Sequence, residues 1–291
     1  MVITTDDPMI PTPSTSHVSF DNIYEPAEDS FLLLDMLSSP AESSWLCRRF
    51  SKETDQSPLL IIEVGTGSGV VLAFATANSD EIFGRPDVLT LGTDVNRNAC
   101  MATRETVLRT IDDKRKGYPN ECGNFSSPVA EKAQTEKETC FLSSVNADLC
   151  AFLRLRNVDV LIFNPPYVPT PDLPALPVSF NESRPVSKWE KFERDSYLLS
   201  LSYAGGLDGM ETTNRLLDSI PEVLNPWRGV AYILLCEQNN PKKVKERIRN
   251  WGDRWTAEIL QGNEKQAGWE RLAVLRIFRD GPDETVSPSN Q

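Results

Sequence analysis

The chain has 291 residues, of which 40% are hydrophobic, and its formal net charge is −12 at pH 7. This length allows one large α/β domain or two small ones. An acidic chain gains nothing from non-specific attraction to phosphate backbones, so nucleic acid is not the expected partner. No apolar run approaches the roughly 18 residues of a membrane-spanning helix, so we expect a soluble protein.

The six cysteines are scattered and form no Cys-x-x-Cys pair, so zinc-ligand spacing is absent and no metal site is predicted. They are Cys47, Cys100, Cys122, Cys140, Cys150 and Cys236. Scattered single cysteines suit a reducing compartment. We therefore expect a cytoplasmic protein, with a nuclear location also open.

The first 19 residues are acidic and rich in Pro, Ser and Thr, which predicts a disordered or extended segment and not a signal peptide. The stretch "YEPAEDSFLLLDML" then predicts a helix that starts near Pro26, with Glu28 and Asp29 in its first turn. Its predicted apolar face consists of Phe31, Leu32, Leu34 and Leu37. The simplest interpretation is a helix that packs on the edge of a sheet.

Two strand-helix units follow. Residues 59–64 predict a buried strand, and a glycine-rich turn leads into a helix from about residue 68 to residue 77. Residues 87–96 predict the second strand, followed by a helix over 97–110. Strands that alternate with helices at this spacing indicate a parallel, doubly wound sheet. Residues 112–138 are polar with little periodicity and predict a surface insertion.

The second half continues the α/β pattern. Residues 139–149 and 158–167 predict the third and fourth strands, and a long Pro-rich connection covers 168–196. A glycine turn and helix over 203–224 precede a fifth strand at 229–237 and a late strand at 270–280. We predict a single α/β domain over residues 20–280 and a loose tail over 281–291.

The turn after the first strand reads Glu-x-Gly-x-Gly-x-Gly from Glu63, with glycines at Gly65, Gly67 and Gly69. Glycines permit unusual backbone angles and close ligand approach, although such a turn can be purely structural. The dinucleotide fingerprint would require its third glycine at Val70. Glu63 would repel a pyrophosphate, whereas S-adenosylmethionine carries an ammonium and a sulfonium that favour a carboxylate.

Two further acids follow the next two strands. Asp94 offers two oxygens to the two hydroxyls of a ribose, and Asp148 is placed to accept from an adenine amino group. An isolated aspartate at a strand end is more often a helix cap or a turn residue. Three acids after three successive strands, counting Glu63, favour the cofactor interpretation.

The fourth strand ends in Asn164, Pro165, Pro166 and Tyr167. Asn164 and Pro165 both precede prolines, which sets them in extended conformations. The Asn164 side chain and the Pro165 carbonyl are then predicted to accept both N–H groups of a substrate –NH₂, while Tyr167 packs over a planar amide or base. The single histidine, His17, lies in the N-terminal segment, so we expect catalysis by orientation and not by a strong base. The alternative is a proline-stiffened turn without catalytic function.

These motifs carry a family resemblance. The Asn-Pro-Pro-Tyr loop looks like that of methyltransferases that modify the amino groups of adenine or cytosine, or the amide of glutamine. Together, "YEPAEDSFLLLD", "EVGTGSG", "TDVN", "FNPPYVPTP" and "AGGLDG" resemble the HemK family of glutamine methyltransferases, in its short eukaryotic and archaeal branch. The resemblance implies a class I S-adenosylmethionine-dependent methyltransferase fold, which is a Rossmann-like doubly wound sheet, mostly parallel with an antiparallel late strand.

The resemblance also implies an activity and a set of site residues. The expected reaction methylates the side-chain amide of the glutamine in the Gly-Gly-Gln motif of a class I release factor. Cofactor and catalytic roles carry over directly to Glu63, Gly65, Asp94, Asp148 and Asn164. Ser30 stands where the family has Thr or Ser after Glu-Asp and should touch the tail of S-adenosylmethionine.

The resemblance further implies a partner, a small zinc-binding activator subunit that covers an apolar edge of the sheet. The strand over 139–149 should then lie at or near an edge, because in the family that side of the sheet meets the activator. An exposed edge that carries Phe141 and Leu142 would favour aggregation unless a partner covers it. This chain departs from the usual short form in the insertion over 112–138 and in the long connection after Tyr167. Because of these two segments, the sequence does not show which residues around the active site contact the substrate.

Two other functions stay open at this point. An adenine-amino nucleic-acid methyltransferase shares the tetrapeptide. Such an enzyme must bind a polyanion and flip a base, which a net charge of −12 without an obvious basic stripe disfavours. A non-catalytic scaffold with the same fold is disfavoured, because residues for the cofactor and for the acceptor occur together.

Overall fold

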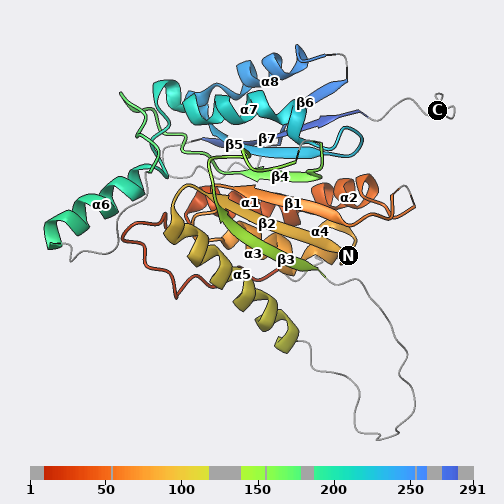
Figure 1. The fold of residues 1–291 in the computed structure, drawn as a ribbon. Coiled ribbons are helices and arrows are strands. Elements are labelled where there is room, and N and C mark those ends of the chain that lie inside the picture. Colours follow the sequence, from red (N-terminus) through yellow and green to blue (C-terminus); the bar gives the residue numbers. More distant parts are fainter. Residues whose placement is uncertain are drawn as a thin grey trace, which may run out of the picture.

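The computed structural model describes residues 10–53, 55–117, 139–154, 156–177, 187–252, 254–260 and 271–280. These residues form a seven-stranded sheet of order β3-β2-β1-β4-β5-β7-β6, with helices on both faces (Figure 1). The strands are β1 Leu59–Val64, β2 Val88–Asp94, β3 Cys140–Asn146, β4 Val160–Phe163, β5 Val230–Cys236, β6 Trp255–Leu260 and β7 Leu272–Arg279. None of the described helices is long and apolar enough to cross a membrane.

The pairing confirms the doubly wound sheet. Strand β1 lies parallel between β2 and β4, β5 continues the parallel set, and β7 pairs antiparallel with β5. Every residue of β4 and β5 is buried, as expected for parallel strands covered on both faces. Strand β6 was not predicted from the sequence; it pairs antiparallel with β7 and forms the far edge of the sheet.

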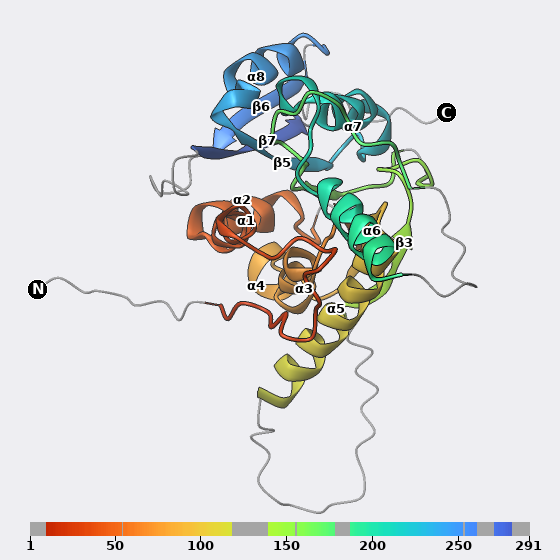
Figure 2. The same ribbon diagram turned by 90° about the vertical axis from the view of Figure 1, so that its left-hand side faces the viewer.

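Helices cover the two faces unequally (Figure 2). The helices are α1 Glu28–Ser38, α2 Pro40–Arg49, α3 Val70–Ala77, α4 Ser79–Phe83, α5 Arg97–Gly117, α6 Lys188–Ser200, α7 Glu211–Val223 and α8 Pro241–Arg249. One apolar core joins the sheet to α1 through α4, and α5 packs beside α3. The second core joins the opposite face to α7 and α8. Helix α6 projects outward, away from both cores.

Two predicted boundaries were wrong. The helix after β2 continues to Gly117, so residues 112–117 belong to α5 and not to the polar insertion. Ion pairs with i, i+4 spacing, such as Asp112 with Lys116, stabilise this charged extension. The Pro-rich connection ends at α6, whose start is fixed by a capping box between Ser187 and Glu190. The rest of the predicted insertion, residues 118–138, and the tail 281–291 lie outside the described residues.

The N-terminal region also differs from the prediction. Helix α1 packs on a face of the sheet and not on its edge; Phe31 is 41% exposed, while Leu33 and Met36 are buried. Residues 10–19 are irregular, but Ile10 packs against the core and His17 Nε2 lies 3.1 Å from the hydroxyl of Thr106 on α5. These residues are therefore held on the domain, whereas residues 1–9 of the predicted disordered segment lie outside the described ranges.

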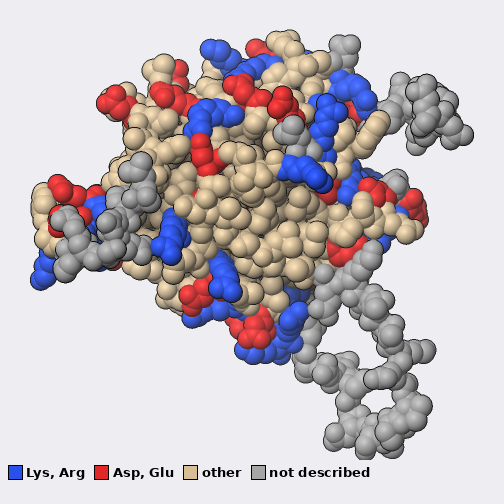
Figure 3. Space-filling model, in the orientation of Figure 1, with Lys and Arg blue, Asp and Glu red and all other residues tan. Residues whose placement is uncertain are grey.

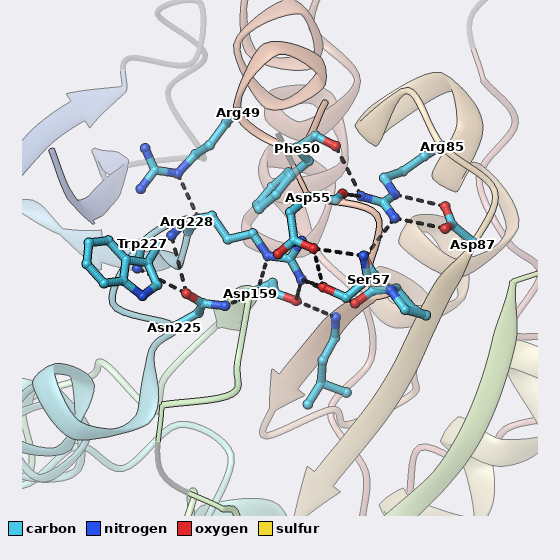
Figure 4. A network of polar contacts seen from close by, with 12 residues as sticks. Arg49, Phe50, Asp55, Ser57, Arg85, Asp87, Asp159, Asn225, Trp227 and Arg228 are labelled. Atoms are coloured by element: carbon cyan, nitrogen blue, oxygen red, sulfur yellow. Dashed lines mark hydrogen bonds and ion pairs between the residues drawn. The ribbon is translucent and has the colours of Figure 1, made fainter. Parts of the chain in front are cut away.

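A buried polar network closes the amino end of the sheet (Figure 4). Asp159, just before β4, is 2% exposed and accepts from Arg228 Nε at 2.8 Å, Asn225 Nδ2 at 3.0 Å and the Leu60 amide at 2.9 Å. Asp55 lies 2.9 Å from the Arg228 guanidinium. These bonds join the starts of β1, β4 and β5, at the end of the sheet opposite to the site described below.

Breaking this network should destabilise the domain. Asp159→Asn removes one partner of a buried ion pair and should lower the free energy of unfolding by roughly 3 kcal/mol, the low end for such pairs because Asp55 remains. The control is Glu105→Gln, which breaks the exposed ion pair with Arg109 and should cost at most about 0.5 kcal/mol. Chemical denaturation measures both changes. Equal effects of the two substitutions would contradict the assigned role of Asp159.

Candidate active site

The register of the central strands brings three loops together. Val64, the last residue of β1, pairs with Thr93 of β2 on one side and with Phe163 of β4 on the other. Because parallel strands end at the same edge, the glycine turn, Asp94 and Asn164 emerge side by side. This edge is where α/β sheets commonly bind ligands.

A cavity opens at this edge, and most of the residues predicted for the site line it. They are Ser30, Glu63, Gly65, Gly67, Asp94, Asp148, Asn164 and Pro166. Apolar residues from the Pro-rich connection and from the C-terminal part of α6 form another part of its wall, including Leu173, Leu176 and Leu198. The connection and α6 therefore border the cavity directly, although the sequence left their role open.

Two residues of the tetrapeptide lie apart from the cavity lining in the described structure. Pro165 is buried, and Tyr167 packs against the core on the face of α1 through α4. The Tyr167 carbonyl accepts from Asn239 Nδ2 at 3.0 Å, which anchors the end of the loop. The predicted contacts of the Pro165 carbonyl and the Tyr167 ring with a substrate stay predictions.

All three glycines of the turn have positive φ, and a Cβ at Gly69 would lie only 2.5 Å from Thr103 Cα. Gly65 and Gly67 have φ of 65° and 52°, in the left-handed region that other residues rarely adopt. A Cβ at Gly65 would lie 3.4 Å from the Phe163 ring, whereas one at Gly67 would meet nothing within 4 Å. The turn therefore packs closely on β4 at its start and leaves room for a ligand at its middle.

Two carboxylates face the cavity beside this turn. Glu63 is 3% exposed, and its Oε2 accepts from the Leu72 amide at 2.9 Å. Burial, together with the negative charge of Asp94, raises the pKa of Glu63 well above its usual value. Asp94 accepts from the Gly67 amide at 3.0 Å and from the Asn96 amide at 2.7 Å, and burial raises its pKa to about 6.

These acids fit a cationic ligand. Within the described residues, backbone amides bond to Glu63 and Asp94 but no ion pair neutralises either carboxylate. A sulfonium and an ammonium would supply the missing positive charge, whereas a pyrophosphate would add to the repulsion. The cavity thus fits S-adenosylmethionine, with Asp94 able to accept from ribose hydroxyls. No described group of three or more His, Cys, Asp or Glu could hold a metal ion.

Asp148 lines the same cavity from the turn after β3. Its Oδ2 forms an ion pair with Arg215 of α7, which also lines the cavity. Both side chains are partly exposed, at 30% for Asp148 and 45% for Arg215. The predicted bond from an adenine amino group to Asp148 stays a prediction, and Arg215 is a neighbour that the sequence did not indicate.

Asn164 occupies the meeting point of the cofactor turn and the acceptor loop. Its Nδ2 donates to Asp29 Oδ2 at 3.0 Å. Its Oδ1 is buried at the cavity and has no hydrogen-bond partner among the described residues. Ser30 lies beside this pair, and its amide donates to Asp29 Oδ1 at 2.6 Å. An unpaired buried acceptor is costly, so its presence here indicates a site for a donor from a ligand.

Sequence reasoning missed Asp29 as a site residue. It stands next to Ser30 in "AEDS", and its position in the first turn of a helix already explains an acid there. Its partner lies 135 residues away, and no local pattern reports such a contact.

No protein-family model matches the chain. The chain is 31% identical to Methyltransferase HEMK2 of Mus musculus, over 94% of its own length and 98% of the relative's. It is 29% identical to the eRF1 methyltransferase catalytic subunit mtq2 of Schizosaccharomyces pombe, over 94% and 97% of the two chains. A solved METTL16 methyltransferase domain aligns at 14% identity with a TM-score of 0.43, over 88% of this chain and 85% of that one, which is too distant to bear on function.

The sheet order, the glycine turn and the acidic cavity define a class I S-adenosylmethionine-dependent methyltransferase. Within that class, identity over nearly the full length shows that the chain belongs to the HEMK2 family of methyltransferases, the short branch of the HemK family.

Asp94 should control cofactor affinity. Asp94→Ala removes the predicted ribose acceptor and should weaken S-adenosylmethionine binding by about 1–3 kcal/mol, the scale of hydrogen bonds to charged groups. Titration calorimetry measures this loss, and an unchanged affinity would make Asp94 a turn residue only.

Cofactor affinity should also depend on pH. The raised pKa of Asp94, about 6, means that this carboxylate gains a proton as pH falls through that value and then accepts fewer hydrogen bonds. Affinity of the wild-type protein should therefore decrease below pH 6. The variant Asp94→Asn cannot titrate at this position, so its affinity should vary less with pH. Any pH dependence of the affinity that remains in this variant would come from Glu63. An identical pH profile in the variant would exclude Asp94 as the titrating group.

Proposed function

We propose that this protein methylates the side-chain amide of the glutamine in the Gly-Gly-Gln motif of a class I release factor. The observation that carries the proposal is the unpartnered Oδ1 of Asn164, which lies at the cofactor cavity on the same sheet edge as Asp94 and the glycine turn. A relative 29% identical carries the name of an eRF1 methyltransferase catalytic subunit, which supports a release factor as substrate.

The proposed mechanism is positioning. S-adenosylmethionine supplies an electrophilic methyl group on a sulfonium. Asn164 Oδ1 accepts one N–H of the glutamine amide, and the Pro165 carbonyl accepts the other, so that the nitrogen lone pair points at the methyl carbon. On transfer, the amide nitrogen would form a C–N bond as the C–S bond of the cofactor breaks, and the nitrogen would then lose one proton to solvent. Both acceptors stabilise the positive charge that develops on nitrogen.

The surface favours a protein substrate over a nucleic acid. On the face shown in Figure 3, Lys and Arg are interspersed with Asp and Glu and form no continuous basic stripe. Leu176, which lines the cavity, is 47% exposed. On α6, Trp189 and Phe192 are 67% and 62% exposed. Exposed apolar side chains suit contact with a protein surface, and the net charge of −12 opposes a polyanion.

The acceptor loop provides the direct test. Asn164→Ala should reduce methyl transfer by orders of magnitude because the acceptor nitrogen loses its orientation, while the fold and S-adenosylmethionine affinity stay nearly unchanged. Transfer of labelled methyl measures the rate, and calorimetry measures the affinity. Near-normal turnover by Asn164→Ala would exclude this mechanism.

Competing acceptors test the substrate. We expect labelled methyl on a release factor and none on a DNA duplex present in the same reaction. A release factor with the Gly-Gly-Gln glutamine changed to alanine is the matched control and should receive no label. Preferential labelling of the duplex would favour the adenine-amino alternative instead.

We further propose that a small zinc-binding activator subunit covers the edge at β3. Strand β3 pairs only with β2 in the described sheet, and a bulge opposite Thr90 and Leu91 leaves Leu142 unpaired and 50% exposed. Asn146, at the end of β3, donates to the carbonyls of Asp94 and Val95, both at 2.9 Å. A partner that orders β3 would therefore also steady the cofactor acid. By reciprocity, the partner and the cofactor would each tighten the other.

The isolated chain should be poorly soluble and bind S-adenosylmethionine weakly, and co-expression with the activator should restore both properties. Leu142→Lys should prevent co-purification of the activator because it places a charge in the covered edge. Trp227→Lys, which changes an exposed apolar residue just before β5, four positions from β3 in the sheet order, should not. A monodisperse isolated chain with the cofactor affinity of the complex would refute the coupling.

A release factor as substrate implies a cytoplasmic or nuclear location, which is part of the proposal.

A further inference from the structure

The Asn164 amide has two chemically different ends, and its function depends on which end faces the cavity. An amide oxygen accepts a hydrogen bond from a substrate –NH₂, whereas an amide –NH₂ in the same place would repel it. In the structure Nδ2 donates to Asp29 Oδ2, which leaves Oδ1 as the buried end without a partner in a residue that lines the cavity. The loop sequence by itself does not determine this choice, because the two ends have nearly the same shape.

Asp29 determines it. An ionised carboxylate can only accept, so it must face the donor end of the amide. Rotating the Asn164 amide by half a turn would place its oxygen where Nδ2 now lies 3.0 Å from Asp29 Oδ2, and two acceptors would then oppose each other. The rotation would also replace a hydrogen bond to a charged group with repulsion in a buried place.

Asp29 is itself held in place. It is 3% exposed, and its Oδ1 accepts from the Ser30 amide at 2.6 Å and from the Ser30 hydroxyl at 3.3 Å. The first turn of α1 also favours a negative charge through the helix dipole. With Oδ1 directed to Ser30, Oδ2 is left to meet Asn164.

We infer that Asp29 is the positioning residue that turns the Asn164 amide so that its oxygen, and not its nitrogen, meets the acceptor N–H. This inference rests on the proposed function, because it explains how Asn164 comes to accept. It also gives α1, otherwise a packing helix, a role in selecting substrates that donate N–H.

The test begins with Asp29→Asn, which keeps the volume but introduces a donor. The new amide can donate to Asn164 Oδ1, so the orientation of Asn164 is no longer fixed. We expect kcat to fall by about 100-fold, the scale of a small misplacement of reacting groups. The KM for release factor and the dissociation constant for S-adenosylmethionine should change much less than kcat. A loss of cofactor affinity with kcat unchanged would overturn the inference, because Asp29 would then act on the cofactor.

A reciprocal exchange gives the rescue. Asn164→Asp alone sets a second carboxylate against Asp29 and should be inactive. Combined with Asp29→Asn, it restores one donor and one carboxylate at the contact, with an oxygen again facing the cavity. We expect the double variant to exceed both single variants in kcat. A double variant no better than the single ones would contradict an orienting role for Asp29.

A matched control and a second readout separate this inference from the proposed function. Asp195→Asn disrupts a comparable buried contact, in which Asn22 Nδ2 donates to Asp195 Oδ1 at 2.8 Å, and should leave kcat unchanged. The side-chain NH₂ resonances of Asn164, assigned by their loss in Asn164→Ala, should shift in Asp29→Asn and not in Asp195→Asn. This spectrum tests the orientation even if release factor is not the substrate. Unshifted resonances in Asp29→Asn would refute the inference alone.

Discussion

The parallel alignment of β1 with β2 and β4 is the constraint on which the rest of this structure depends. Because Val64, Thr93 and Phe163 are in register, the residues that follow them leave the sheet at one level. The first of these segments is the glycine turn, which leaves room for a ligand, the second offers a carboxylate and the third offers an amide. A slip of one residue in either pairing would turn the alternating side chains to opposite faces and would separate these groups.

The acidic character of the cavity is the second constraint. Glu63 is buried and Asp94 is partly buried, and removal from water raises the pKa values of both carboxyl groups. A positively charged ligand would favour the ionised form of both. Raised pKa values of this kind are typical of functional sites, and a ligand that binds the folded chain makes ligand binding and fold stability interdependent.

Much of the fold could be predicted from sequence because its signals are local. The apolar runs of β1, β4 and β5, the glycines with positive φ and the proline pair after Asn164 each determine structure over a few residues. The elements that were missed have weaker local signals. Strand β6 mixes polar and apolar residues at an edge, and the extension of α5 is charged on most sides. Contacts between distant segments, such as Asp29 with Asn164 and Asp148 with Arg215, have no local signature at all.

The contact between α1 and the loop after β4 has a consequence for how activity is acquired during folding. Its two residues are 135 positions apart, so the contact closes a long loop at a cost in chain entropy. A chain in which α1 has not docked lacks the contact that orients the Asn164 amide, and it also lacks Ser30 in the wall of the cavity. Both sides of the cavity, the one for the cofactor and the one for the acceptor, therefore depend on the docking of α1 as well as on the register of the central strands.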